Sequence, residues 1–185
     1  MIRLSNTTSE IVERSQMEFL NHNRRCVFVK DIPEITIGGE KIGPFTSTAQ
    51  ADLPNWAIEK LVAHGIAELA QDEDLESLGN LQNISRNEEG SPQLQSLHPL
   101  VYSAISRRIL NLQSDKSSLD ERLYDEIEKL QRIVPMLLES RLSKIIRVAK
   151  SGALPDKRKD MALEERWLCE ELANLISDWR KSLFN

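Results

Sequence analysis

The sequence predicts an α+β protein, with a small N-terminal β-rich domain followed by a larger C-terminal α-helical bundle domain. Short runs of β-branched and aromatic residues, broken by Gly and Pro, fill residues 25–70. Apolar residues then recur at three- and four-residue steps over most of residues 98–185. Between these parts, residues 71–95 hold six acidic side chains against one arginine, which predicts a linker or long loop. We therefore expect four segments: an N-terminal extension 1–24, a β-rich domain 25–70, an acidic linker 71–97 and a helical domain 98–185.

The β-rich domain is predicted to contain short strands and one helix. Residue types favour strands at 25–30, 34–37, 40–42, 45–48 and 66–69. Gly38-Gly39 supplies the positive-φ residues of a tight hairpin turn. Pro54 suits the first position of a helix, and His64-Gly65 is a good helix end. A domain of this size is only marginally stable alone, so it should pack against a neighbour.

Three amphipathic helices are predicted in the C-terminal part, over about residues 100–112, 119–149 and 163–183. Pro135 lies inside the second helix and should kink or divide it. The last helix carries Trp167 and Trp179, and its apolar stripe is wider than one helix of a small bundle needs. We expect either that this helix is central or that part of its stripe contacts another chain.

Composition excludes several classes of protein. The chain has 185 residues and a net charge of −5, from 24 basic and 29 acidic side chains, which disfavours broad, nonspecific coating of nucleic acid. Cys26 and Cys169 have neither the spacing of a metal site nor that of a disulfide framework, which favours a protein of the reducing cell interior. The first residues show no signal peptide pattern, and no apolar run approaches the roughly 18 residues of a membrane span. A soluble, intracellular protein is therefore expected.

The sequence shows little that predicts catalysis. No recognisable motif surrounds any histidine, so structural roles are preferred for His22, His64 and His98. The Gly38–Lys41 segment lacks the spacing and the following helix of a phosphate-binding loop. The acid pairs on helices, including Glu164-Glu165, are interpreted as solvated residues. We expect no metal, no cofactor and no enzymatic activity.

One group of basic residues has two open interpretations. Four cations recur at three-residue steps near the end of the second helix and three more follow it: Arg141, Lys144, Arg147, Lys150, Lys157, Arg158 and Lys159. They could form a positive patch that meets phosphates or an acidic partner. The favoured interpretation is a solvated helix face, because no base-stacking aromatic residues accompany the group.

The chain resembles a known family in both of its halves. Residues 27–69 are similar to the small β-rich domain of archaeal GINS subunits, through Asp31-Ile32-Pro33, Gly38-Gly39, Gly43-Pro44-Phe45, Leu53-Pro54 and Ala67-Glu68. The later part resembles the helical domain of that family, through the R-x-x-K-I pattern of Arg141, Lys144 and Ile145, the acidic opening Leu163-Glu164-Glu165 and the terminal Trp179-Arg180. The small domain precedes the helical domain, as in one of the two archaeal subunit classes.

This resemblance implies a non-enzymatic scaffold of the replisome. GINS subunits assemble as tetramers, in archaea as two copies of each class, and the second class has the opposite domain order. They bind the MCM replicative helicase and a RecJ-like protein, and they contact primase or DNA polymerase. The resemblance thus implies a cytoplasmic, nucleoid-associated protein that stimulates the helicase through binding energy.

The candidate subunit interface consists of apolar residues of the two long helices: Leu137, Leu142, Ile145, Trp167, Leu172, Ile176 and Trp179. A DNA-binding transcriptional regulator that uses the basic helix face is the alternative, and it would show salt-dependent DNA affinity. A small enzyme is the weakest hypothesis, because it requires one of the unpromising histidines or acids to be functional. An obligate oligomer, by contrast, would be expected to aggregate or self-associate when isolated.

Overall fold

The computed structural model describes residues 7–70, 73–114 and 121–184 of the chain. The chain divides into two compact units, one of residues Gln16–Asp74 and one of Leu75–Asn185 together with Met1–Ser15. A strand-containing N-terminal part followed by a larger helical part confirms the predicted α+β class.

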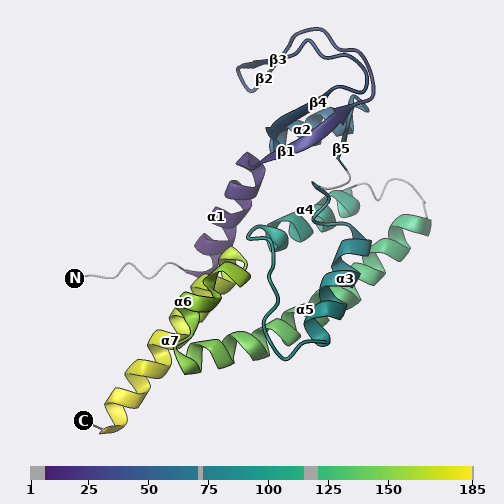
Figure 1. Ribbon diagram of the computed structural model, residues 1–185. Coiled ribbons are helices and arrows are strands. Elements are labelled where there is room, and N and C mark those ends of the chain that lie inside the picture. Colours follow the sequence, from purple (N-terminus) through teal and green to yellow (C-terminus); the bar gives the residue numbers. More distant parts are fainter. Residues whose placement is uncertain (1–6, 71–72, 115–120, 185) are drawn as a thin grey trace. The chain divides into compact units, whose positions relative to one another are not determined.

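The small unit is built on a three-stranded antiparallel sheet (Figure 1). β1 (Asn23–Phe28) is the central strand, and β4 (Gln50–Pro54) and β5 (Ala67–Leu69) pair on either side of it. β1 buries every second side chain, because successive residues of a strand point to opposite faces. α2 (Asn55–Ala63) covers the sheet with Ile58 and Leu61, and these side chains complete the core around Cys26 and Phe28.

A separate hairpin extends the small unit. β2 (Ile35–Ile37) and β3 (Glu40–Ile42) pair in register, and Gly38 and Gly39 between them have φ values of 62° and 91°. This confirms the predicted turn, because positive φ is readily available only to glycine. A Cβ atom on Gly38 would lie 2.6 Å from Cη2 of Trp56, so glycine also makes room for the indole ring. The predicted strand at 45–48 is wrong: Phe45 makes one isolated bridge to Ile32, and the sheet strand is β4.

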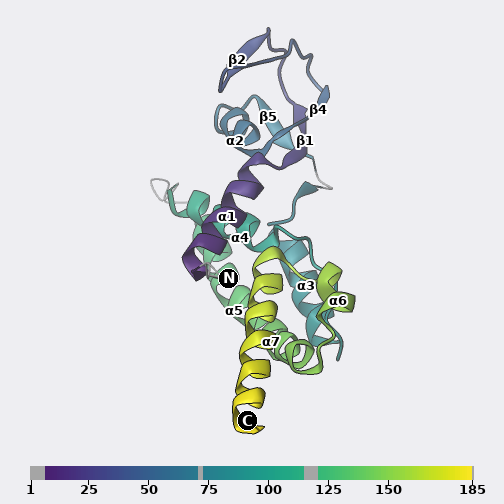
Figure 2. The ribbon, with the colours of Figure 1, turned by 90° about the vertical axis from the view of Figure 1, so that its left-hand side faces the viewer.

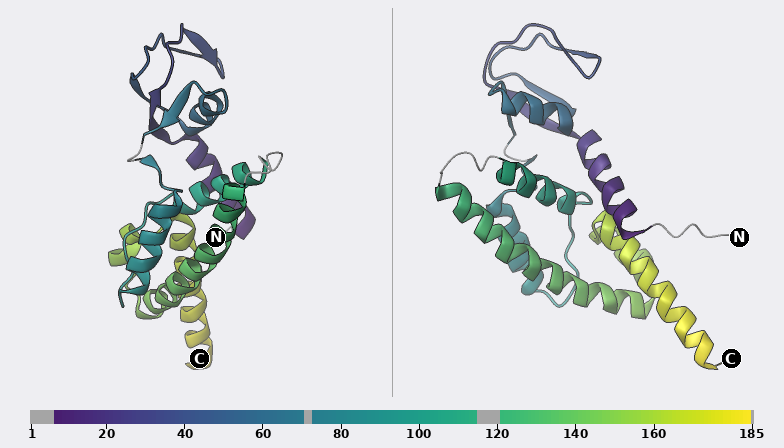
Figure 3. Two further views of the ribbon diagram at one scale, coloured as in Figure 1. Left: turned by 90° about the vertical axis from the view of Figure 1, so that its right-hand side faces the viewer. Right: turned by 180° about the vertical axis from the view of Figure 1, so that it is seen from behind.

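The helical unit contains α3 (Leu78–Glu89), α4 (Val101–Ser114), α5 (Glu121–Ser151), α6 (Leu154–Lys157), the 3-10 helix η2 (Arg158–Asp160) and α7 (Leu163–Phe184). α5 is the longest of these, and α3, α4 and α7 all pack against it (Figures 1 and 3). α5 is one continuous helix through Pro135, so of the two expected effects of this proline, a kink or a division, the division does not occur. The predicted start of this helix at Leu119 lies outside the described residues.

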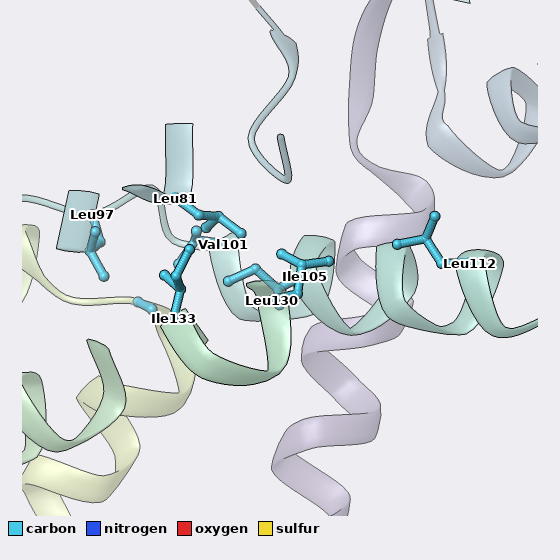
Figure 4. Close-up of a cluster of buried hydrophobic side chains, with 8 residues drawn as sticks. Leu81, Leu97, Val101, Ile105, Leu112, Leu130 and Ile133 are labelled. Carbon is cyan, nitrogen blue, oxygen red and sulfur yellow. The ribbon is translucent and has the colours of Figure 1, made fainter. Parts of the chain in front are cut away.

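Two apolar clusters hold the helical unit together. Figure 4 shows the first, in which Ile105 of α4 and Leu130 of α5 point toward each other; its buried members are Leu81, Leu97, Val101, Ile105, Leu112, Leu130, Ile133 and Ala162. The second joins the end of α5 to the first half of α7; its buried members are Leu94, Ile145, Val148, Ala149, Met161 and Cys169. Burial of these side chains is the main stabilising contribution to the unit.

The segments predicted to lie outside the two domains contribute to the structure. Residues 71–97 were expected to be a linker, but they contain α3 and bury Leu81, Leu94 and Leu97. The linker prediction is therefore wrong for the described part of this segment. The N-terminal extension contains α1 (Thr8–Asn21), which begins in the helical unit and ends in the small unit. Its first turn is closed by a reciprocal cap between Thr7 and Glu10.

Candidate functional site

A buried network of charged residues joins the helices of the helical unit. At its centre is Arg141 of α5, which is fully buried and uses all five of its N–H donors. Nε and Nη2 donate to the two oxygens of Glu165 on α7, each at 2.6 Å. Nη1 donates to Glu88 Oε2 on α3 at 2.9 Å and to the Gln95 carbonyl at 2.8 Å, and Nη2 also donates to the Asp160 carbonyl at 3.0 Å.

The remaining groups of this network are satisfied as well. Lys144, one turn further along α5, donates to Glu88 Oε1 at 2.6 Å, to the Glu88 carbonyl and to the Gln93 carbonyl at 3.3 Å. Glu165 accepts the Tyr102 hydroxyl of α4 at 2.6 Å and the Ala162 N–H at 2.9 Å, which closes the first turn of α7. The network therefore contains two buried cations and two buried carboxylates, so its formal charges balance.

The pKa shifts in this cluster have clear physical causes. Burial raises the pKa of the Tyr102 hydroxyl well above its ordinary value, and the neighbouring Glu165 carboxylate raises it further. Burial alone would lower the pKa of Arg141, but the hydrogen bonds and negative charge of Glu165 outweigh this effect and raise it. Both shifts keep Tyr102 neutral and Arg141 charged near neutral pH, as the observed hydrogen bonds require.

This geometry corrects the prediction of a basic patch. Arg141 and Lys144 were expected on a solvated or phosphate-binding face, but both are buried against carboxylates. The physical reason is that Glu88 and Glu165, from two other helices, supply their counter-charges. Glu165 was likewise expected to be solvated and is buried.

The five other predicted basic residues remain at the surface or partly exposed. Arg147 donates to the Pro92 carbonyl at 3.3 Å, and Lys150 and Lys159 are exposed. Lys157 pairs with Asp160 at 3.6 Å, and Arg158 pairs with Glu170. With two of its seven cations buried and two more paired, this group gives the DNA-binding alternative no support.

The histidines and cysteines considered for catalysis or metal binding have structural roles. His64 is the C-terminal cap residue of α2, and Nδ1 of His98 accepts the Leu100 N–H at 3.2 Å. Cys26 and Cys169 are buried in the two units, and burial raises the pKa of both thiols. Across residues 7–70, 73–114 and 121–184, no three His, Cys, Asp or Glu side chains are grouped so that they could hold a metal ion.

Among the described residues of the helical unit, the most exposed large apolar side chains lie on the last part of α7. Leu175, Trp179 and Leu183 follow one another at four-residue steps and are 67%, 60% and 58% exposed. They continue the stripe of Leu172 and Ile176, which packs against the second apolar cluster. In Figures 1 and 2 the end of α7 runs past the end of α5 with no other helix beside it. We call Leu175, Trp179 and Leu183 the α7 apolar row.

α5 carries a second set of exposed apolar side chains. Leu138 and Ile146 are exposed and Leu142 between them is half-buried, so the three form a line at four-residue steps. Met136 is exposed as well, on another face of α5. We call Leu138, Leu142 and Ile146 the α5 apolar row. Exposed apolar residues grouped in this way, rather than scattered singly, are typical of interaction surfaces.

The predicted interface residues fall into two groups. Leu137 and Ile145 are buried in the protein's own core, so their assignment to a subunit interface is wrong. They lie on the inner side of α5, where periodicity alone could not separate core from interface. Leu142, Trp167, Leu172 and Ile176 are partly buried, and Trp179 is exposed. The sequence prediction omitted Leu138, Ile146, Leu175 and Leu183, although all four continue apolar stripes that are visible in the sequence.

No helix among the described residues combines the length and the apolar character that a membrane crossing requires.

No curated protein matches the chain. Residues 74–184, more than half of the chain, match the Sld5 family model, described as the GINS complex protein helical bundle domain. The match spans the elements that form the buried network and both apolar rows, from α3 to α7. The chain therefore belongs to the GINS family and is a GINS complex subunit.

Proposed function

We propose that this chain is a non-enzymatic subunit of the GINS DNA replication complex that scaffolds and stimulates the MCM replicative helicase at the replication fork. Membership of the GINS family supports a role in complex formation with other GINS subunits. The single observation that carries the proposal is the α7 apolar row, which is presented by a helix that extends beyond its own bundle.

The α7 apolar row has the properties of a protein interface. Tryptophan contributes strongly to binding when a partner buries it, and two leucines lie one turn before and after Trp179. Burying such side chains contributes about 1.5–3 kcal/mol each when they pass from full exposure to full burial. A short helix end without tertiary contacts is also only marginally stable in water, so a partner that packs on it would stabilise it.

The buried network supports this role by fixing where the rows lie. Arg141 holds α7 to α5 through Glu165, and Glu88 holds α3 to the same arginine. These contacts set the direction in which α7 leaves the bundle. A scaffold subunit needs such a fixed surface because a partner then binds without first ordering it.

We propose specific partners on the basis of the resemblance of both halves to archaeal GINS subunits. The first is a GINS subunit of the opposite domain order, in a 2:2 heterotetramer. The others are the MCM helicase, a RecJ-like replisome protein, and primase or DNA polymerase. In this assembly the chain would hold the helicase ring closed by binding energy alone, at the nucleoid in the cytoplasm.

Co-expression with a GINS subunit of the opposite domain order tests this proposal. The mass of the purified complex, measured by light scattering, should correspond to two copies of each chain. In the double variant L175Q/W179Q the complex should be at least about 100-fold weaker, because a loss of about 3 kcal/mol corresponds to that factor. The control K181Q changes an exposed residue on the opposite side of α7 and should assemble normally.

Helicase stimulation needs a separate measurement. The purified complex should increase the rate at which MCM unwinds a forked DNA, and the L175Q/W179Q chain should fail to do so at concentrations where the K181Q chain succeeds. A stable monomer that ignores the candidate subunit would contradict the scaffold function. A complex that assembles normally without affecting MCM would contradict only the helicase part of the proposal.

A further inference from the structure

Two chain connections join the small unit to the rest of the chain. One side chain of the small unit, Arg24, contacts the small-unit residues next to both connections. The first connection lies within α1, where the small unit begins at Gln16, and the second follows Asp74. Arg24, the second residue of β1, is 2% exposed and lies in the small unit together with the residues that end both connections. A buried guanidinium is costly unless its donors are satisfied, so its contacts are informative.

Arg24 makes a contact on each side. Its guanidinium carbon lies 5.4 Å from the centre of the Phe19 ring on the last turns of α1, within the range of a cation–π interaction. Its Nη2 donates to the backbone carbonyl of Glu73, one residue before the small unit ends. One planar group therefore contacts the segment by which the chain enters the small unit and the segment by which it leaves.

Asn55 completes this arrangement. Its Oδ1 accepts from Arg24 Nη1 at 3.1 Å, and its N–H donates to the His22 carbonyl in the turn after α1 at 3.0 Å. Asn55 is the first residue of α2 and is buried. It thus attaches Arg24 to the packed core of the small unit and holds the turn between α1 and β1.

We propose that Arg24 is a clasp that couples the two chain connections of the small unit, so that the end of α1 and the segment around Glu73 are held or released together. The proposal rests on contacts within the small unit and does not depend on the proposed function. Arginine suits the role because its rigid fork reaches two acceptors while its face covers a ring. Lysine would keep the cation but could not reach Asn55 and Glu73 in the same way.

Amide hydrogen exchange on the full chain tests this clasp. The reporter is the Glu73 N–H, which donates to the Ala70 carbonyl at 3.0 Å next to the carbonyl that Arg24 holds. In R24M and in R24K this amide should exchange at least about tenfold faster, because local opening no longer breaks the hydrogen bonds to Arg24. The Phe28 N–H, bonded to the Ala49 carbonyl within the small unit, should keep its rate in R24K.

The neighbouring arginine provides a matched control. Arg25 follows on the same strand, and it pairs at 3.6 Å with the exposed Asp52. R25M should leave the exchange rate of the Glu73 amide unchanged. The clasp is refuted by a Glu73 amide that exchanges at the native rate in R24K. It is equally refuted if the Phe28 amide accelerates as much as Glu73 in R24K, because Arg24 would then be a general core residue.

Discussion

Replacing Arg141 by methionine tests the buried network most sharply. The side chain makes five hydrogen bonds, two of them to Glu165 and one to Glu88. In R141M two buried carboxylates share the single remaining buried cation of this network, Lys144. Removing one partner of a buried ion pair costs about 3–5 kcal/mol, because the other partner is left as an uncompensated buried charge.

This loss is large against the total stability of a domain, which is typically about 5–15 kcal/mol. The helical unit should therefore melt about 9–30 °C lower, since each kcal/mol corresponds to roughly 3–6 °C for a domain of this size. Helical circular dichroism is the appropriate assay because most of the helix belongs to this unit. Urea unfolding gives the free energy directly if the m-value is unchanged.

A second arginine serves as the control. Arg108 of α4 pairs with Glu126 of α5 at 2.8 Å, but 41% of its side chain is exposed. R108M should cost at most about 1 kcal/mol, as surface ion pairs do. If R141M costs no more than R108M, the network does not hold the helices as described. Replacing Arg141, Lys144, Glu88 and Glu165 together by apolar residues of similar volume should recover much of the loss, because no buried charge is then left unpaired.

Three further predictions concern single residues outside this network. G38A should destabilise the small unit by about 1–3 kcal/mol, because alanine is strained at φ 62° and its Cβ would meet Trp56. Urea unfolding followed by Trp56 fluorescence measures this when both chains also carry W167F and W179F, which remove the signal of the helical unit. Cys26 and Cys169 should resist thiol reagents in the folded chain and react after unfolding, because burial raises the pKa of both thiols; timed labelling and mass measurement check this. E164Q should gain stability relative to the native chain as pH rises above the ordinary pKa of a carboxyl group, and unfolding at a series of pH values shows this.

The sign of the Glu164 effect follows from its environment. Burial raises the pKa of Glu164, and its buried Oε2 has no hydrogen-bond partner among the residues that the structure describes. The folded state therefore binds the proton more tightly than the unfolded state, so the native chain loses stability as pH rises from the ordinary pKa to the raised one. Glutamine has no such titration. If the free energies of unfolding of E164Q and the native chain differ by the same amount at every pH in this range, the pKa of Glu164 is not raised.

Simple results would also contradict the predictions for G38A and for the two cysteines. G39A changes a neighbouring glycine with φ 91° whose Cβ would meet nothing, so it isolates backbone strain from the clash with Trp56. Equal losses in G38A and G39A would show that the indole contact does not matter. Rapid labelling of either cysteine under native conditions would show that the thiol is reached by local opening of its core.

The fold class and the long helices could be predicted because their signals are local. Apolar residues at helical spacing predicted α4, α5 and α7, and Gly38-Gly39 predicted the hairpin. α1 has an equally local signal that the prediction did not use, since Thr7 and Glu10 form a capping box. Ser77 likewise caps α3 by accepting the Asn80 N–H.

α3 was obscured by its composition. Of the three residues that α3 buries fully, Leu81, Ser85 and Glu88, only one is apolar, and Leu78 and Ile84, which also pack on the first apolar cluster, are only partly buried. A helix with this inner face resembles an exposed segment in the sequence, and the surrounding acidic residues strengthened that impression. Its packing depends on Glu88 finding cations on another helix, which no local pattern can reveal.

The position of Arg141 and Lys144 could not be predicted for the same reason. Their three-residue spacing is the same for a solvated helix face and for a face buried against acids. Their partners come from 53 and 24 residues away for Arg141 and from 56 residues away for Lys144. A contact of this range depends on the tertiary fold, and periodicity contains no information about it.

The central claim is that another GINS subunit covers the α7 apolar row, and side-chain footprinting tests it most directly. Hydroxyl radicals should oxidise Trp179 readily in the isolated chain, where it is 60% exposed. In the complex with the subunit of opposite domain order, oxidation of Trp179 should fall at least several-fold, together with that of Leu175 and Leu183. A complex of the expected mass in which Trp179 is oxidised as fast as in the isolated chain would contradict the claim.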